Sequence, residues 1–205
     1  MLCQIIITLF IILNLYFIFN LYLTDKDSSL KLAKDRNELK IHLFKKNPVL
    51  ISLPKNKIDI EIFNNLKPTY KNNINFNSLK LSSLINFDKI LLNSDILCNF
   101  QYSLSYYDEK QLISFKECNN NYHIISCIDG EEYYIYLLHP KYKDLKYGEA
   151  TKYTEKVLIK PYDILIIPFG WKYLQEINNK TINYHIDIDN YFTFCHNFIL
   201  NKLNR

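Results

Sequence analysis

Glycine is scarce in this chain of 205 residues, which contains three, at Gly130, Gly148 and Gly170. Glycines so far apart can form neither a GxGxxG dinucleotide fingerprint nor a GxxxxGK[ST] phosphate loop. Six prolines likewise exclude collagen-like and proline-rich low-complexity sequences. Because the chain otherwise avoids glycine, these three positions are where we expect the backbone to need a conformation that other residues rarely adopt.

Cysteine motifs and hydrolase motifs are also missing. The five cysteines form no CxxC pair, and the spacing between Cys118 and Cys127 is not that of a zinc knuckle. We therefore predict buried, reduced thiols, with a disulfide only if the domain faces an oxidising compartment. No G-x-S-x-G nucleophile elbow occurs, and the adjacent Cys195 and His196 do not make a catalytic dyad, because neighbouring strand residues point apart.

The charge of the chain is nearly balanced. Lysine and arginine total 25, aspartate and glutamate total 21, and the net charge of +4 is spread along the sequence. A nucleic-acid surface usually shows a clustered basic face, so no nucleic-acid partner is predicted. Hydrophobic residues make up 48%, which excludes a disordered chain. The abundance of Asn, Ile, Lys, Tyr and Phe is typical of AT-rich genomes, such as those of large DNA viruses, while the 17 tyrosines suit contacts with a protein partner.

Residues 1–23 form an apolar run without a charged side chain. This length matches a membrane-spanning helix, so we predict a single-pass anchor at 1–23, a charged stalk at 24–40 and a domain at 41–205. A cleaved signal peptide is the alternative, but the run lacks a basic start and a small-residue cleavage site. Lysines and an arginine follow the run and favour a cytosolic domain. The sequon at Asn179 favours the opposite side.

The rest of the chain predicts a mostly β domain with helices before it. A helix is expected from Asp27 to Leu39, followed by a strand within 46–52, a helix at 58–66, an Asn-rich loop at 69–79 and a helix within 79–97. Residues 122–128 read as a strand that ends at the turn signal Asp129-Gly130 and forms a hairpin with 132–138. Further short strands are expected at 157–159, 163–167 and 181–188, a spacing typical of a sandwich or barrel.

Two segments resemble a known family. Residues 160–171, KPYDILIIPFGW, are similar to the P-G-D-x-L-x-I-P-x-x-W segment of the cupin-like jumonji-C family. Residues 129–140 resemble its G-x-K-x-x-x-L-x-P hairpin, and 47–51 resemble its first N-x-P-V-V-I strand. The resemblance implies a double-stranded β-helix of the cupin or jelly-roll type. It also implies Fe(II)- and 2-oxoglutarate-dependent oxygenase chemistry, with iron held by two histidines and one carboxylate.

The functional positions of that family are substituted here. Counting from Gly130 places the H-x-D motif at Glu117 and Asn119, and the second histidine falls at Tyr173. The lysine that would pair with 2-oxoglutarate falls at Glu132, whose carboxylate would repel it. A charge-assisted pair of about 1.5–3 kcal/mol would then be lost. We therefore expect a pseudoenzyme with no catalytic residue and no cofactor, acting in binding or structure.

Other residues leave alternatives open. His185 and Asp187 form the only H-x-D of the chain, and alternate strand residues share a face, so both could reach one ion. With His123, they would be the displaced ligands of an active Fe(II)/2-oxoglutarate hydroxylase; otherwise they form a hydrogen-bonded strand pair. His123 and Trp171 are candidate pocket residues, with a place in the core as the plainer interpretation. A third possibility is an unrelated β-rich module.

Overall fold

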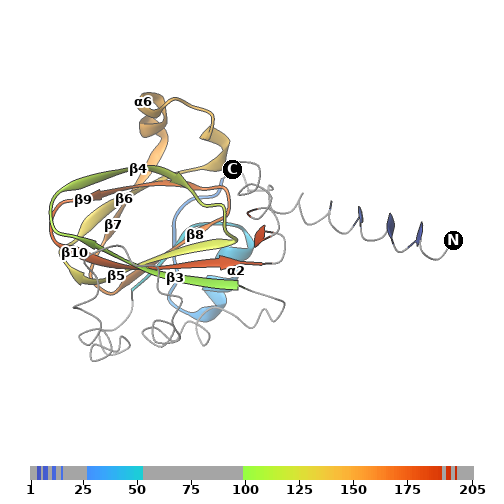
Figure 1. The fold of residues 1–205 in the computed structure, drawn as a ribbon, viewed down its shortest axis with the longest axis horizontal. Helices are drawn as coiled ribbons and strands as arrows, with labels where there is room; N and C mark the ends of the chain where they lie inside the picture. The colour runs from blue at the N-terminus through green and yellow to red at the C-terminus, as the bar shows by residue number, and fades with distance from the viewer. Residues whose placement is uncertain are drawn as a thin grey trace.

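The computed structural model describes residues 27–52 and 99–190, together with short pieces at 4–5, 7–8, 11–12, 15, 193–194 and 197 (Figure 1). Most of the apolar run 1–23, and the elements predicted at 58–66, 69–79 and 79–97, lie outside these residues. Within the described part of the chain, no helix is both long enough and apolar enough to cross a bilayer.

Two β-sheets face each other and make up most of the described structure (Figure 1). In chain order the elements are β1 (Lys31–Leu32), α2 (Arg36–Phe44), β2 (Val49–Ser52), β3 (Asn99–Tyr107), β4 (Gln111–Glu117), β5 (Tyr122–Gly130), β6 (Tyr133–Leu138), η3 (Pro140–Tyr142), α6 (Tyr147–Ala150), η4 (Thr151–Tyr153), β7 (Thr154–Ile159), β8 (Asp163–Pro168), β9 (Lys172–Ile177) and β10 (Thr181–Asp189). The six-stranded sheet has the order β1-β2-β8-β5-β10-β3, and the four-stranded sheet has the order β4-β9-β6-β7.

The strand order is that of a jelly roll. From β3 to β10 the chain crosses repeatedly between the sheets, and every pair among these eight strands is antiparallel. Eight strands in two facing antiparallel sheets with this alternation form the double-stranded β-helix found in cupins. The predicted fold class is therefore confirmed for the β domain. The predicted hairpin of 122–128 with 132–138 is wrong, because β5 and β6 lie in different sheets.

The N-terminal helix begins later than predicted. Lys31 and Leu32 pair in parallel with Val49 and Leu50 at the edge of the six-stranded sheet, so this stretch is strand rather than helix. Helix α2 starts only after Asp35, whose Oδ1 accepts hydrogen bonds from the backbone amides of Asn37 and Glu38 at 2.7 and 2.9 Å. The pairing of Lys31 and Leu32 with β2 therefore prevents the helix from starting at Asp27, as the local sequence had predicted.

Among the described residues, left-handed backbone occurs at two of the three glycines and also at Lys46 and Tyr162. Gly130 has φ +115°, and a Cβ there would lie 2.3 Å from the carbonyl oxygen of Lys180. Gly170 has φ +82°. The expectation is wrong for Gly148, which lies in α6 without a positive φ and where a Cβ would meet nothing within 4 Å. Tyr162, which stands in place of the glycine of the P-G-D segment, also has a positive φ of 74°. The turn therefore keeps a glycine-like backbone despite the substitution.

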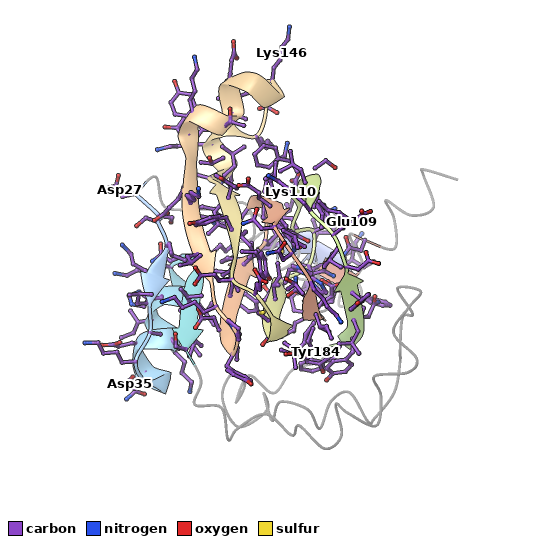
Figure 2. The ribbon with its side chains drawn as sticks, turned by 90° about the vertical axis from the view of Figure 1, so that its left-hand side faces the viewer. Asp27, Asp35, Glu109, Lys110, Lys146 and Tyr184 are labelled. Atoms are coloured by element: carbon purple, nitrogen blue, oxygen red, sulfur yellow. The ribbon has the colours of Figure 1, made fainter. Side chains whose placement is uncertain are left out.

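The six-stranded sheet contributes apolar side chains from both faces and lies between two hydrophobic cores. Its outer face packs against Leu39 and Leu43 of α2. The space between the sheets is filled by side chains (Figure 2) and holds the second core, with Trp171 among its largest members. Around β5 to β8 this interior is aliphatic and aromatic, but toward β3, β4, β9 and β10 it becomes polar. The polar end contains the candidate site.

Candidate functional site

A cavity of about 280 Å³ opens between the two sheets at their polar end. Five strands supply its walls, and the lining consists almost entirely of hydrogen-bonding side chains: Ser103, Ser105, Tyr107, Lys116, Glu117, Cys118, Asn120, His123, Tyr173, Gln175, His185 and Asp187. Such a size suits a small molecule, and the lining suits a polar one.

The alternation of β10 explains which residues reach the cavity. His185 and Asp187 face the interior, whereas Tyr184, Ile186 and Ile188 face the outer core. The prediction that the two residues of the H-x-D motif share a face is confirmed. The register of β10 with β5 sets Asp187 directly opposite His123. Residues 64 positions apart in sequence are thereby brought side by side.

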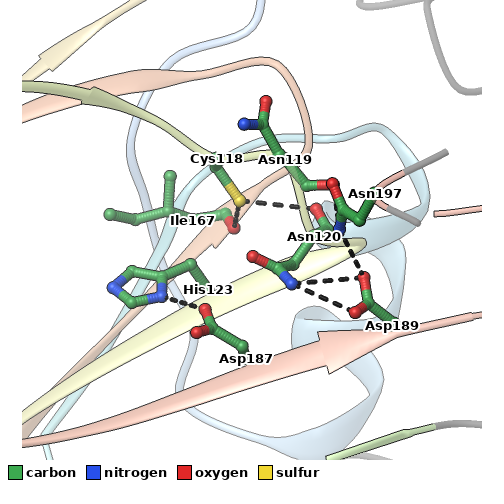
Figure 3. Close-up of polar contacts among 8 residues, drawn as sticks. All are labelled: Cys118, Asn119, Asn120, His123, Ile167, Asp187, Asp189 and Asn197. Atoms are coloured by element: carbon green, nitrogen blue, oxygen red, sulfur yellow. Dashed lines mark hydrogen bonds and ion pairs between the residues drawn. The ribbon is translucent and has the colours of Figure 1, made fainter. Parts of the chain in front are cut away.

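His123 and Asp187 form a close hydrogen-bonded pair. Nδ1 of His123 lies 2.5 Å from Oδ1 of Asp187 (Figure 3). Burial alone would raise the pKa of Asp187, but the hydrogen bond and the charge of His123 outweigh it, so this pKa lies below its usual value. Asp187 is therefore a carboxylate that accepts a hydrogen bond from Nδ1. In the neutral ring this arrangement leaves the lone pair of His123 on Nε2.

Three rings stack along the cavity wall. The centroid of His123 lies 5.1 Å from that of Tyr173 and 5.5 Å from that of His185, with interplanar angles of 15° and 24°. Burial, followed by the charge of His123, lowers the pKa of His185 to about 3, so this imidazole is neutral at physiological pH. Burial also raises the pKa of Tyr173, which keeps its hydroxyl protonated.

Several polar atoms in this region are buried without a hydrogen-bond partner among the described residues. They include Nε2 of His123, Nε2 of His185 and Oε1 of Gln175. Leaving such an atom buried and unpaired costs about 1–3 kcal/mol. Buried polar groups are normally paired, so these atoms point to a partner that binds within the cavity.

Only some of the positions expected from the jumonji-C resemblance reach the cavity. Glu117 and Tyr173 line it together with His123, His185 and Asp187. Asn119 is exposed, and its carbonyl oxygen accepts a hydrogen bond from Asn197 at 3.2 Å (Figure 3). Glu132 is exposed between β5 and β6 and is not part of the lining.

Trp171 belongs to the core rather than to the cavity. Its side chain is 1% exposed, and its Nε1–H donates to the carbonyl oxygen of Lys46 at 3.1 Å. The ring also makes an edge contact with His139, at 5.0 Å between centroids. The plainer of the two interpretations of this tryptophan therefore holds, and it ties the β8–β9 turn to the end of α2.

The residues present do not fit the iron centre of the oxygenases. Among the described residues, no group of three or more His, Cys, Asp or Glu side chains could hold a metal ion. Nδ1 of His123 is occupied by Asp187, and the stacked rings of His123 and His185 lie in near-parallel planes, which disfavours a shared ion. The position of the second family histidine is held by the neutral phenol of Tyr173.

Sequence reasoning missed part of the lining because it missed three strands. Ser103 and Ser105 lie on β3, Lys116 on β4 and Gln175 on β9. The alternation of apolar and polar residues over 113–116, within Gln111–Glu117, was a usable signal for β4. Cys118, predicted to be a buried thiol, is 2% exposed, and its Sγ donates to the carbonyl oxygen of Ile167 at 3.3 Å (Figure 3).

Of the known proteins compared with the chain, only solved structures match it. No family model and no curated protein matches the chain. Protein NMB1881 from Neisseria meningitidis is 8% identical with a TM-score of 0.38, over 62% of this chain and 96% of that one. A cupin-2 domain protein from Shewanella frigidimarina is 10% identical with a TM-score of 0.35, over 63% and 92%. Hydroquinone 1,2-dioxygenase from Sphingomonas is 10% identical with a TM-score of 0.34, over 44% and 60%. The assignment of the fold rests on the strand order described above.

Proposed function

We propose that this domain binds a small polar molecule inside the jelly roll and has lost the iron- and 2-oxoglutarate-dependent reaction of the family it resembles. The observation that carries the proposal is the polar cavity, in which buried atoms of His123, His185 and Gln175 lack partners. A purely structural domain would be more stable with apolar side chains at these positions. Retaining unpaired polar atoms there is understandable if a ligand supplies the missing hydrogen bonds.

The loss of oxygenase chemistry is supported by the donor set. The positions matched to the iron ligands hold Glu117, Asn119 and Tyr173, of which Asn119 is exposed and lies away from the cavity. The position matched to the 2-oxoglutarate lysine holds Glu132, which is also exposed. A carboxylate there offers no cation to a dicarboxylate co-substrate.

An active hydroxylase with displaced ligands is the second candidate. It is favoured by one observation, namely that His123, His185 and Asp187 line the same cavity. Iron binding would require Asp187 to release Nδ1 of His123 and the two imidazoles to leave their stacked arrangement. These rearrangements would forfeit the hydrogen bond that holds the pair.

Iron loading and turnover separate the two candidates. The full-length chain is incubated anaerobically with Fe(II), its metal content is measured, and succinate release from 2-oxoglutarate is followed after oxygen is added. We expect substoichiometric iron and no succinate beyond that of the Asp187→Ala variant. Stoichiometric iron with succinate release that Asp187→Ala abolishes would establish the hydroxylase instead.

Ligand binding is tested directly by saturation-transfer NMR with a panel of small sugars, amino acids and nucleosides. His185→Phe fills the cavity, whereas Leu112→Ala changes a side chain that is 61% exposed and does not line it. We expect transfer signals with the wild type and Leu112→Ala that disappear with His185→Phe. If no compound gives a signal that depends on the cavity, the binding proposal fails.

Membrane anchoring through residues 1–23, with the domain on the cytosolic side, is the remaining part of the proposal, and a protein partner stays a prediction. The support comes from the uncharged run and the basic residues after it. Ile11→Lys combined with Ile12→Lys should release the chain into the soluble fraction after alkaline extraction, while the wild type stays in the pellet. A glycan at Asn179, seen as a mass shift lost in Asn179→Gln, would place the domain on the opposite side.

A further inference from the structure

We propose that His123 and Asp187 form a proton-transfer pair, and that the cavity takes a small α-hydroxy carbonyl compound from which His123 removes a carbon-bound proton. The inference rests on the proposed binding function and adds a reaction to it. The reaction class follows from what the cavity contains: a carboxylate-paired imidazole, a neighbouring phenol and a lysine.

His123 is oriented by its hydrogen bond to Asp187. Its Nδ1 is held 2.5 Å from the carboxylate of Asp187, so the neutral ring presents a lone pair at Nε2. That atom is buried and has no partner among the described residues. Asp187 keeps the ring in this tautomer and stabilises the imidazolium that forms when Nε2 takes a proton. In catalytic triads, too, an imidazole acts as the general base while a buried carboxylate orients it and stabilises its protonated form.

The groups around His123 suit a carbonyl substrate. From β9, the ring of Tyr173 stacks against it with a protonated hydroxyl, and from β10 His185 adds a neutral imidazole. From β4, Lys116 supplies a cation and Glu117 a carboxylate to the same cavity. Negative charge develops on the carbonyl oxygen as the proton leaves, and an ammonium or phenol donor stabilises that charge. Ser103, Ser105 and Gln175 offer hydrogen bonds to hydroxyl groups.

The step is balanced without any further reactant. Nε2 of His123 takes the proton from the carbon that bears the hydroxyl group. The electron pair of that C–H bond forms a C=C bond, and the π pair of the carbonyl moves onto its oxygen, giving an enediolate. The imidazolium then returns the proton to the same carbon. Alternatively it returns the proton to the former carbonyl carbon, while the hydroxyl proton of the enediolate moves to the former carbonyl oxygen and the hydroxyl-bearing carbon becomes the new carbonyl. No net oxidation occurs, and the product is the original compound or its isomer.

Deuterium exchange tests this step. Full-length protein is incubated in D2O with dihydroxyacetone or D-glyceraldehyde, and loss of the α-proton signal is followed by NMR, since the proton on Nε2 exchanges with solvent before it returns. We expect exchange well above the buffer rate with the wild type and Leu112→Ala. His123→Gln should lose about 100-fold or more of the protein-dependent rate, the usual range for a general base. Asp187, a positioning residue, is tested through Asp187→Asn, which should lower the rate and change the pH profile of exchange.

The outcomes distinguish this inference from the binding proposal. Saturation transfer to each probe is recorded in the same samples, and the fluorescence of the single tryptophan, Trp171, verifies that each variant is folded. Binding of the probes without protein-dependent exchange overturns the proton-transfer inference and leaves the binding function standing. Exchange that survives in both His123→Gln and Asp187→Asn overturns it as well. If these probes do not bind but other compounds of the panel do, the assigned substrate class is wrong.

Discussion

Replacing His185 by leucine should make the domain more resistant to acid. His185 is 8% exposed, and its Nε2 has no partner among the described residues. Burial lowers the pKa of this imidazole to about 3, below its value of about 6.5 in an unfolded chain. Below pH 6.5 the unfolded state therefore binds a proton that the folded state refuses, and stability falls as the pH decreases.

The magnitude follows from proton linkage. Between pH 6.5 and about 3, the free energy of unfolding should fall by up to about 1.4 kcal/mol per pH unit because of this one group. From pH 7 to pH 5 the loss amounts to about 2 kcal/mol. His185→Leu removes this loss. At pH 7 the variant should be at least as stable as the wild type, since a buried unpaired nitrogen is replaced by an apolar side chain of similar size.

Urea unfolding at pH 7 and pH 5, followed through Trp171 fluorescence, provides the assay. Ile186→Val is the matched control, because Ile186 is the chain neighbour that faces the outer core. It should cost about 0.5–1.5 kcal/mol equally at both pH values. If His185→Leu loses as much stability as the wild type between pH 7 and pH 5, His185 is not a buried neutral histidine and the reasoning is refuted.

Three further predictions concern the scaffold. Burial raises the pKa of Cys118 and raises that of Cys127 to about 12, so mass spectrometry should find both unmodified by iodoacetamide at pH 8 until urea unfolds the chain. Gly130→Ala should destabilise by about 2 kcal/mol or more, because its Cβ would meet backbone atoms at a positive φ, while Gly148→Ala should cost nothing in the same thermal melts. Trp171→Phe should destabilise by about 2 kcal/mol through the lost hydrogen bond and a small cavity, measured by far-UV circular dichroism, and an unchanged melting temperature would contradict its role as an anchor.

Strands were predicted correctly where the segment itself is rich in residues that favour β-structure. Residues 122–130, 163–168 and 181–189 are rich in branched and aromatic residues, and each forms a strand close to the predicted bounds. The edge strands β3 and β4 were missed because each mixes polar and apolar residues, most of which are exposed or half-buried, so neither forms a continuous apolar run. The hairpin after Gly130 was wrong because a turn signal does not say whether the next strand returns to the same sheet or crosses to the other.

The sequence by itself determined the β-rich class, the left-handed backbone at Gly130 and Gly170 and the shared face of His185 and Asp187. Each of these depends on residues close together in the chain, through backbone sterics and the two-residue period of a strand. The tertiary structure alone decided that Asp187 would face His123, that Tyr173 would stack on it and that Asn119 and Glu132 would stay outside the cavity. Those relations depend on the register between strands far apart in sequence, which is set by packing across the whole sandwich rather than by any local pattern.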